Sequence, residues 1–302
     1  MEPWHLPVLC WQRRCDSYLH SDHLTRVGEL LVTWPREPLE EHPTDCFKVG
    51  GDYWIWQRGI GGVQFAAERP EISAFPSEEV DQAWFEYLVT RSWLPAAYHI
   101  WGRQVLHASA VATTGSGDVV AFAGPSGAGK STMAYGLGQR PSWNAVCDDT
   151  LAFSCAQTRV LLHPLPNEAR LRPRSAAHYG RTDAAPEPIV WPSGPLRLRR
   201  VYFLSGEENL QQAVAITPLG ASDTYVLLLE QAHALTLKIR QHNQRLMRDY
   251  LELTARISAF RLTYRKSFDA IDEIFDTIES HVAAGAPRDP AVQPNVVGSK
   301  GV

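Results

Sequence analysis

The stretch that decides the fold is VVAFAGPSGAGKST, residues 119–132. Its first five residues are all apolar, which predicts a strand buried on both faces of a sheet. The residues that follow match the pattern G-x-x-x-x-G-K-[ST], and we expect a helix to begin near Lys130. Glycines allow such a loop to close around phosphate groups with its backbone N–H groups pointing inward. The expected nucleotide-binding residues are therefore Gly124, Pro125, Ser126, Gly127, Ala128, Gly129, Lys130, Ser131 and Thr132.

The loop also predicts what it binds. The positive end of the following helix lies at the loop and favours an anion there. Lys130 would reach the β- and γ-phosphates, and the hydroxyl of Ser131 would bind Mg²⁺. The expected cofactors are ATP and Mg²⁺, although the loop contacts phosphates and not the base and so does not itself select ATP from other phosphoryl donors.

Two consecutive acids, Asp148 and Asp149, follow a short predicted strand, eighteen residues after Lys130. In P-loop proteins an acid at the end of a neighbouring strand faces Mg²⁺ and the γ-phosphate. Because successive side chains of a strand point to opposite faces, the two carboxylates are expected to have different partners. One would face the phosphates and the other the adjacent strand, where we expect His107. A turn or N-cap role for one of the acids is the alternative.

From residue 105 to 283, strands alternate with helices, which predicts an α/β domain. We expect strands over 105–111, 119–123, 144–147 and 199–204, and helices over 130–137, 222–239, 243–256 and 269–281. Residues 284–302 have no periodicity and are expected to be a disordered tail.

Residues 1–104 are expected to form a smaller β-rich domain, which holds eight of the ten tryptophans. Apolar runs over 53–56 and 63–65, separated by glycines, indicate hairpins. A helix over 80–98 would follow, with Ser77 as its N-cap. The tryptophans indicate an aromatic core or, alternatively, a peptide-docking surface.

Composition and charge exclude several classes of protein. The chain has 302 residues, of which 44% are hydrophobic and 21% charged, so it is not a disordered chain. A net charge of −4 gives no reason to expect nucleic acid or an anionic membrane as partner. We find neither an apolar stretch of about 18 residues nor an export signal. The five cysteines form no Cys-x-x-Cys pair, which favours reduced thiols and a cytoplasmic protein.

Taken together, these residues resemble the HPr kinase family, bacterial serine kinases whose P-loop domain is related to phosphoenolpyruvate carboxykinase. The resemblance rests on LHASAV at 106–111, the loop at 124–132 and CDD at 147–149, and more weakly on RVYFL at 200–204. It implies an HPr kinase-like domain over 105–283, with a mixed sheet flanked by helices. Within this group the chain looks most like the kinases of gene clusters for ribosomally made peptides, above all lasso peptides.

The resemblance implies roles for four residues of these motifs. His107 matches the active-site histidine, Lys130 the phosphate-binding lysine and Ser131 the magnesium ligand. Asp148 matches the aspartate that accepts the proton of the substrate serine hydroxyl during phosphoryl transfer.

Three further residues are assigned less directly. Asp149 is a candidate for catalysis and, with Ser131, for holding Mg²⁺. Glu168 begins a Glu-Ala-Arg segment, the nearest match to the Glu-x-Arg segment that helps the family hold Mg²⁺, with a solvated loop as the alternative. Arg265 would supply a cation to the transferred phosphate.

The chain departs from HPr kinase proper in three places. Leu171 stands where the family has glycine, the late Pro-Gly-Arg-Asn segment is absent from 261–268, and the first hundred residues differ. We therefore expect a serine kinase of a peptide or small protein, with the C-terminal serine of a lasso-type precursor as its acceptor. A true HPr kinase/phosphorylase and a nucleotide-binding switch without transfer activity are the alternatives.

The arginines over 159–200 indicate a solvated face or a groove for an anionic partner. No nucleic-acid or membrane partner is expected. Because HPr kinases assemble, a homo-oligomer is compatible with the resemblance.

Overall fold

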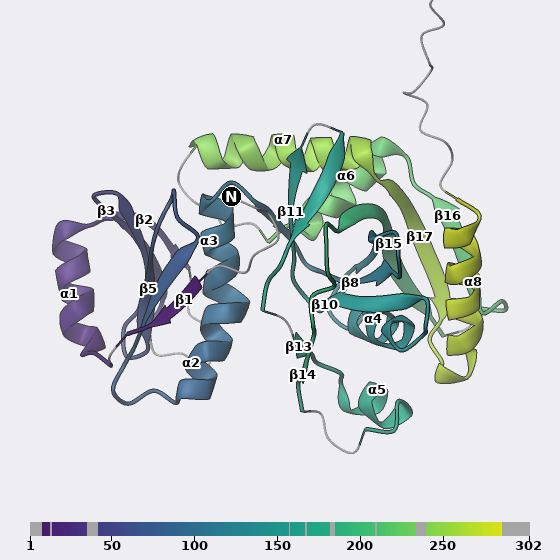
Figure 1. Cartoon of the computed structure of the whole chain (residues 1–302), viewed down its shortest axis with the longest axis horizontal. Helices are drawn as coiled ribbons and strands as arrows, with labels where there is room; N and C mark the ends of the chain where they lie inside the picture. Colours follow the sequence, from purple (N-terminus) through teal and green to yellow (C-terminus); the bar gives the residue numbers. More distant parts are fainter. Residues whose placement is uncertain are drawn as a thin grey trace, which may run out of the picture.

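The computed structural model of this chain describes residues 8–12, 14–34, 42–156, 158–166, 168–181, 185–208, 210–233 and 240–285. Its strands form a six-stranded sheet, a nine-stranded sheet and a two-stranded ladder (Figure 1). The nine-stranded sheet is mixed and carries helices on both faces, so the predicted α/β class is confirmed. No helix among the described residues is long and apolar enough to cross a membrane.

The six-stranded sheet contains the hairpins predicted for the first hundred residues. Its strand order is β1-β6-β5-β4-β3-β2, antiparallel except for the parallel pair β1 and β6. The strands are β1 (Val8–Trp11), β2 (Glu29–Trp34), β3 (Thr44–Val49), β4 (Asp52–Gln57), β5 (Gly61–Ala66) and β6 (Glu71–Pro76). Helix α1 (Ser17–Val27) packs on one face, where Leu24 meets Phe47 and Trp56.

The opposite face is covered by a helical stretch that is broken by a π-helical turn. It consists of α2 (Gln82–Leu88), the turn η1 (Val89–Trp93) and α3 (Leu94–Ile100). The predicted N-cap at Ser77 is wrong, because the Asp81 side chain accepts the Trp84 N–H at 2.8 Å. Ser77 instead forms a β-bridge with Cys15, so its backbone is extended.

Most of the described tryptophans contribute to an aromatic core. Trp56 and Trp93 are buried, and Trp34, Trp54 and Trp101 pack partly buried against the same clusters. Trp11 and Trp84 are exposed, and Trp4 lies outside the described residues.

The nine-stranded sheet has the order β10-β8-β9-β15-β12-β11-β7, with β17 beside β15 and β16 beside β17. Strands β9, β15 and β17 are parallel, so their carboxyl ends meet at one edge. The strands are β7 (Gln104–Leu106), β8 (Ala108–Thr113), β9 (Asp118–Ala123), β10 (Trp143–Cys147), β11 (Leu151–Ala156), β12 (Arg159–His163), β15 (Arg197–Glu207), β16 (Val214–Pro218) and β17 (Ser258–Arg265).

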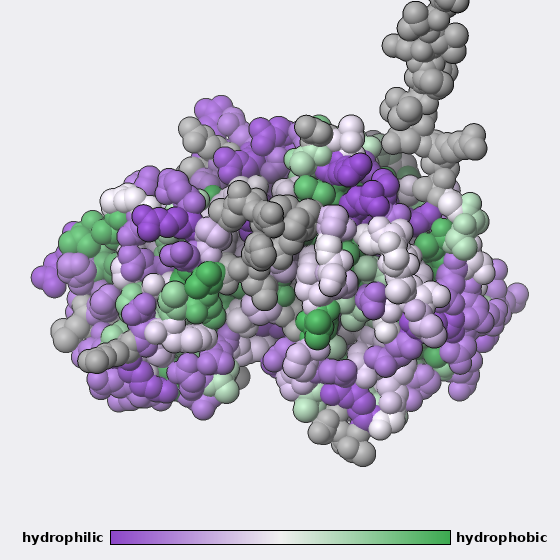
Figure 2. All heavy atoms as spheres, in the orientation of Figure 1, coloured by the Kyte–Doolittle hydropathy of each residue, from purple (hydrophilic) through white to green (hydrophobic). Residues whose placement is uncertain are grey.

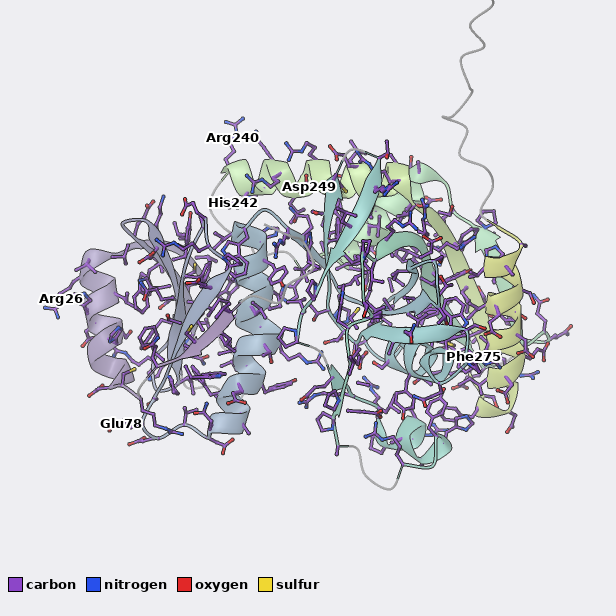
Figure 3. The ribbon with its side chains drawn as sticks, in the orientation of Figure 1. Arg26, Glu78, Arg240, His242, Asp249 and Phe275 are labelled. Atoms are coloured by element: carbon purple, nitrogen blue, oxygen red, sulfur yellow. The ribbon has the colours of Figure 1, made fainter. Side chains whose placement is uncertain are left out.

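Helices α4 (Lys130–Gly138) and α8 (Ile271–Ala283) cover one face of this sheet, and α6 (Ala221–Glu230) and α7 (Arg240–Arg256) cover the other (Figure 1). Helix α8 approaches α4 closely, since a Cβ on Gly136 would lie 2.4 Å from Phe275 (labelled in Figure 3). Outside this layer lie the ladder of β13 (Glu168–Ala169) with β14 (Glu187–Pro188) and the short helix α5 (Pro173–His178). In the space-filling view of Figure 2, an indentation separates α2 from this outer segment.

Several predicted boundaries change. The strand expected over 105–111 is split at His107 into β7 and β8, because the His107 N–H donates to the Gln231 carbonyl at 2.7 Å. The helix expected over 222–239 ends at Glu230, since the next residues bond to β7, and residues 234–239 lie outside the described residues. Helix α7 begins at Arg240, and a 3-10 turn, η2 (Phe268–Ala270), precedes α8.

Strands β11, β12, β16 and β17 and helices α1 and α5 were not predicted from the sequence. Of the expected tail, Ala284 and Gly285 are described and the remainder lies outside. All five cysteines are free thiols.

The two sheets are joined by a shared core. Val105, Ala152 and Leu165 belong to the same buried cluster as the inner residues of the six-stranded sheet and α3. Across this junction, the Tyr98 hydroxyl of α3 donates to the Pro164 carbonyl. The helical stretch from α2 to α3 is therefore packed against the nine-stranded layer.

Candidate active site

The glycine loop, residues 124–131, connects β9 to α4 at the edge where the parallel strands end. Gly124, Gly127 and Gly129 have φ angles of 143°, 83° and 89°, a region that residues with a Cβ rarely adopt. A Cβ on Gly129 would also lie 2.8 Å from the hydroxyl of Tyr264. The turn therefore requires glycine, as the motif predicts.

Lys130 is folded back over the loop. Its Nζ donates to the carbonyls of Gly124 at 2.8 Å and Pro125 at 3.3 Å. Burial lowers the pKa of Lys130, while the nearby Asp149 and Asp148 carboxylates act in the opposite direction. The ammonium group thus lies inside the loop that the sequence assigns to phosphates.

Neighbouring elements hold the loop in shape. The Tyr264 hydroxyl on β17 donates to the Ala128 carbonyl at 2.8 Å. The Arg172 guanidinium donates to Ser126 Oγ at 3.2 Å, and the Thr132 and Ser175 hydroxyls are 2.8 Å apart. The loop is therefore braced from β17 on one side and from the start of α5 on the other.

Asp148 lies just past the end of β10 and is almost fully buried. Ser109 Oγ donates to its Oδ1 at 2.7 Å, and the Arg170 backbone N–H donates to its Oδ2 at 2.9 Å. Asp148 and Ser131 both line a cavity of about 190 Å³ between α4, β10 and residues 187–190.

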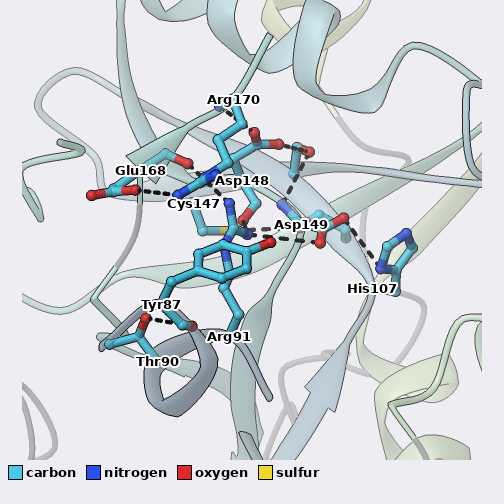
Figure 4. A network of polar contacts seen from close by, with 11 residues as sticks. Tyr87, Thr90, Arg91, His107, Cys147, Asp148, Asp149, Glu168 and Arg170 are labelled. Atoms are coloured by element: carbon cyan, nitrogen blue, oxygen red, sulfur yellow. Dashed lines mark hydrogen bonds and ion pairs between the residues drawn. The ribbon is translucent and has the colours of Figure 1, made fainter. Parts of the chain in front are cut away.

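Asp149 faces the other way. Its φ of 71° is the one positive value found at a described residue other than glycine, and it marks a turn rather than a continued strand. Its Oδ1 lies 3.4 Å from His107 Nδ1, and its Oδ2 lies 3.7 Å from Arg91 Nη1 (Figure 4). The two acids thus have different partners, and Asp149 is the one beside His107.

His107 stands at the break between β7 and β8. Burial lowers the pKa of His107, and the Lys130 charge acts in the same direction, whereas Asp149 raises it. The ring of His107 is thus placed to be a polar partner of Asp149.

The other predicted residues are less closely grouped. The Glu168 carboxylate pairs with Arg170 Nη2 at 3.1 Å, and in Figure 4 it lies on the opposite side of Arg91 from His107. Arg265 ends β17. Because Tyr264 points to the loop, the alternation along the strand turns Arg265 to the opposite face.

Arginines of the segment 159–200 do not form one groove in the described structure. Arg170 and Arg172 lie at the site. Arg197 and Arg199 pair with Asp118 at the start of β9, which is the other end of that strand.

Three contributing residues were missed by sequence reasoning. Ser109 could have been noticed as a polar residue within an apolar strand, two positions after His107. Tyr264 and Arg91 carry no local signal, because their positions depend on how distant elements pack. Arg170 was predicted as the arginine of the Glu-Ala-Arg segment, and it contributes its backbone N–H.

The donor set fits Mg²⁺. No three His, Cys, Asp or Glu side chains converge as metal ligands within the described part of the chain. Ser131 and Asp148 line one cavity. Mg²⁺ commonly takes one or two protein oxygens and completes its shell with phosphates and water. Ser131 and Asp148 are thus suitable to hold it. Asp149, which faces His107 and Arg91, and the paired Glu168 are weaker candidates.

Comparisons with known proteins give matches among solved structures alone. No protein-family model matches the chain, and no curated protein sequence matches it. A solved structure that matches is "Structure of the Hpr(Ser) kinase/phosphatase from Coxiella burnetii". The TM-score is 0.33 with 12% sequence identity, over 60% of this chain and 92% of that chain. At these values the two structures share no more than a general likeness.

Proposed function

We propose that this protein is an ATP- and Mg²⁺-dependent kinase that phosphorylates a serine hydroxyl of a peptide or small protein. One observation carries the proposal. A glycine loop that encloses Lys130 stands at the carboxyl edge of parallel strands, and Ser131 and Asp148 line the cavity beside it. This arrangement provides a phosphate cradle, a hard-cation ligand and a base within one site.

Each group has a part in the transfer. When bound, Mg-ATP would supply the γ-phosphoryl group and leave as ADP, and the metal ion would neutralise part of the phosphate charge. Lys130 and the loop amides bind the phosphates. The Asp148 carboxylate accepts the proton of the attacking hydroxyl, with Ser109 and the Arg170 amide fixing its orientation. Asp149 and His107 form a second pair of polar groups beside the loop.

The size and position of the cavity favour a peptide acceptor that binds in an extended conformation and inserts one side chain. Its lining includes the small residues Ala134, Gly138 and Ala145, and its volume of about 190 Å³ is below that of a typical pocket for a whole drug-sized ligand. Strand β10 is one of the edge strands of the described nine-stranded sheet, and its residues line the same cavity. We extend the proposal to the C-terminal serine of a ribosomally made, lasso-type precursor, which is the first acceptor to test.

The test is phosphoryl transfer measured by intact mass. The protein is incubated with ATP, Mg²⁺ and serine-containing precursor peptides, and separately with HPr. A gain of one phosphate on a precursor peptide supports the proposal. Phosphorylated HPr would instead favour an HPr kinase. If the protein binds the nucleotide but transfers phosphate to no acceptor, the result would favour a nucleotide-binding switch without transfer activity.

Asp148→Asn tests the assignment of the base. We expect a loss of transfer of about a hundredfold or more, because an amide cannot accept the proton. Binding of an ATP analogue without Mg²⁺ should change by no more than about twofold. Asp149→Asn is the matched variant at the adjacent position. Unchanged transfer by Asp148→Asn together with loss in Asp149→Asn would move the role of base to Asp149.

A further inference from the structure

Arg91 is the residue through which the helical stretch α2–η1–α3 reaches the candidate site. Its Nη1 donates to the Asp148 carbonyl at 3.1 Å, and its Nη2 donates to the Glu168 carbonyl at 3.4 Å. The same Nη1 lies 3.7 Å from Asp149 Oδ2. Figure 4 shows the guanidinium between the turn at 148–149 and the strand at 168–170.

These contacts suit arginine in particular. Only 13% of the Arg91 side chain is exposed, whereas the Asp149 side chain is 49% exposed. A guanidinium presents several N–H donors in a rigid plane, so it can bind two carbonyls and a carboxylate at once. A lysine ammonium is a compact point charge on a flexible stem and cannot hold the three acceptors in one geometry.

The helical side of the contact is also organised. Arg91 lies in the π-helical turn η1, a feature often found at functional sites. Thr90 Oγ1 donates to the Glu86 carbonyl at 2.9 Å and supports the turn. The Tyr87 ring lies 6.0 Å from Arg91 Cζ and 4.3 Å from Arg170 Cζ, within cation–π range of both.

Arg91 also has an electrostatic effect on the two acids. Asp148 and Asp149 are consecutive, and a bound triphosphate would add more negative charge beside them. A partly buried guanidinium in contact with this turn offsets the repulsion at short range. It therefore favours the conformation in which Asp149 faces His107.

We propose that Arg91 is a positioning residue that acts through Asp149, and that the amino-terminal part of the chain is thereby a structural component of the catalytic centre. This inference rests on the proposed function. Arg91 holds the turn at 148–149 against the strand at 168–170 and keeps the Asp149 carboxylate beside His107. It touches neither nucleotide nor acceptor in this account.

The first test separates kcat from KM for ATP hydrolysis, which needs no peptide acceptor. Arg91→Gln should lower kcat by about tenfold to a hundredfold, the cost of a small misplacement of a catalytic group. KM for ATP should stay within about twofold, and Arg91→Lys should fall between Arg91→Gln and the wild type. The control Arg26→Gln, on exposed α1 at the far side of the six-stranded sheet (Figure 3), should match the wild type. A wild-type kcat for Arg91→Gln would overturn the proposal.

A double-mutant cycle tests whether Arg91 acts through Asp149. In an Asp149→Asn background, Arg91→Gln should lower kcat by less than about twofold further. The full single-mutant loss in that background would contradict the inference. Thermal unfolding of each variant verifies folding, and Arg91→Lys replaces Arg91→Gln in the cycle where the latter does not fold.

Hydrogen exchange measured by mass spectrometry provides a readout that does not need activity. In Arg91→Gln, peptides over 147–150 and 168–172 should exchange at least about threefold faster, and the peptide over the glycine loop should not change. If the wild type neither hydrolyses ATP nor transfers phosphate, the proposed function fails. In that case exchange alone decides: faster exchange supports the Arg91 contact, and unchanged exchange overturns it.

Discussion

At the scale of single residues, the glycine loop depends on backbone angles that a side chain opposes. The φ angle of Gly129 is 89°, and a Cβ added at this residue would lie 2.8 Å from a neighbouring hydroxyl. That hydroxyl belongs to Tyr264 and is held by the Ala128 carbonyl, so it does not move aside without losing its bond. The residue is thus constrained by both conformation and space.

Gly129→Ala should weaken binding of an ATP analogue by about tenfold. The left-handed conformation costs a residue with a Cβ about 1–2 kcal/mol, and about 1.4 kcal/mol corresponds to a factor of ten. Isothermal titration calorimetry measures the change. The control is Gly220→Ala, where φ is −69° and no atom lies within 4 Å of the new Cβ. Equal affinities of Gly129→Ala and the wild type would show that the loop does not contact the nucleotide.

At the scale of elements, the site is formed where separate strands end at one edge. Strand β9 supplies the loop, β10 leads into the two acids, and β17 supplies the hydroxyl that braces the loop. The break between β7 and β8 places His107 at the same edge, beside Asp149. None of these contacts is local in sequence except within the loop itself.

Tyr264→Phe should loosen the loop without disturbing the sheet. The ring stays in the buried cluster under α4 and α8, and only the bond to the Ala128 carbonyl is lost. We expect a loss of about 1 kcal/mol in the free energy of unfolding and a rise of a few-fold in KM for ATP.

The matched control is Tyr225→Phe, which removes a hydroxyl that bonds the Met247 carbonyl at 3.4 Å on α7, away from the loop. Urea unfolding and steady-state kinetics provide both measurements. A KM that rises equally in the two variants would exclude a specific role for the Tyr264 hydroxyl.

At the scale of the whole molecule, the two sheets meet through a junction that holds a buried histidine. His99 on α3 is 2% exposed, and neither of its ring nitrogens has a hydrogen-bond partner among the residues that the structure describes. The rings of His99 and His242 of α7 lie 6.4 Å apart. Burial lowers the pKa of His99 to about 4, and the charges of His242 and His233 act in the same direction.

The protein should therefore become less stable in mild acid. An unfolded histidine binds its proton near pH 6.5, whereas folded His99 does so only near pH 4. Protons thus favour the unfolded chain as pH falls through this interval, and at pH 4.5 the loss from His99 is about 2–3 kcal/mol. Urea unfolding at pH 7.5 and 4.5 measures this effect. Between these pH values, the free energy of unfolding should fall by about 2–3 kcal/mol less in His99→Leu than in the wild type. If the free energy of unfolding falls as much in His99→Leu as in the wild type, the acid sensitivity comes from other groups. The control is His23→Gln, which changes an exposed side chain.

The sequence alone determined the loop and the class of fold. The apolar run at 119–123, the glycines and Lys130 define a strand, a turn and a helix start that depend only on neighbouring residues, so a linear pattern was sufficient. It also predicted that Asp148 and Asp149 have different partners, because that follows from the geometry of consecutive residues. The tertiary structure decided which acid faces His107, since Asp149 leaves the strand direction with a positive φ. It alone brought Arg91 and Tyr264 to the site, because their contacts join elements far apart in the chain, and such contacts are fixed by packing rather than by any local pattern.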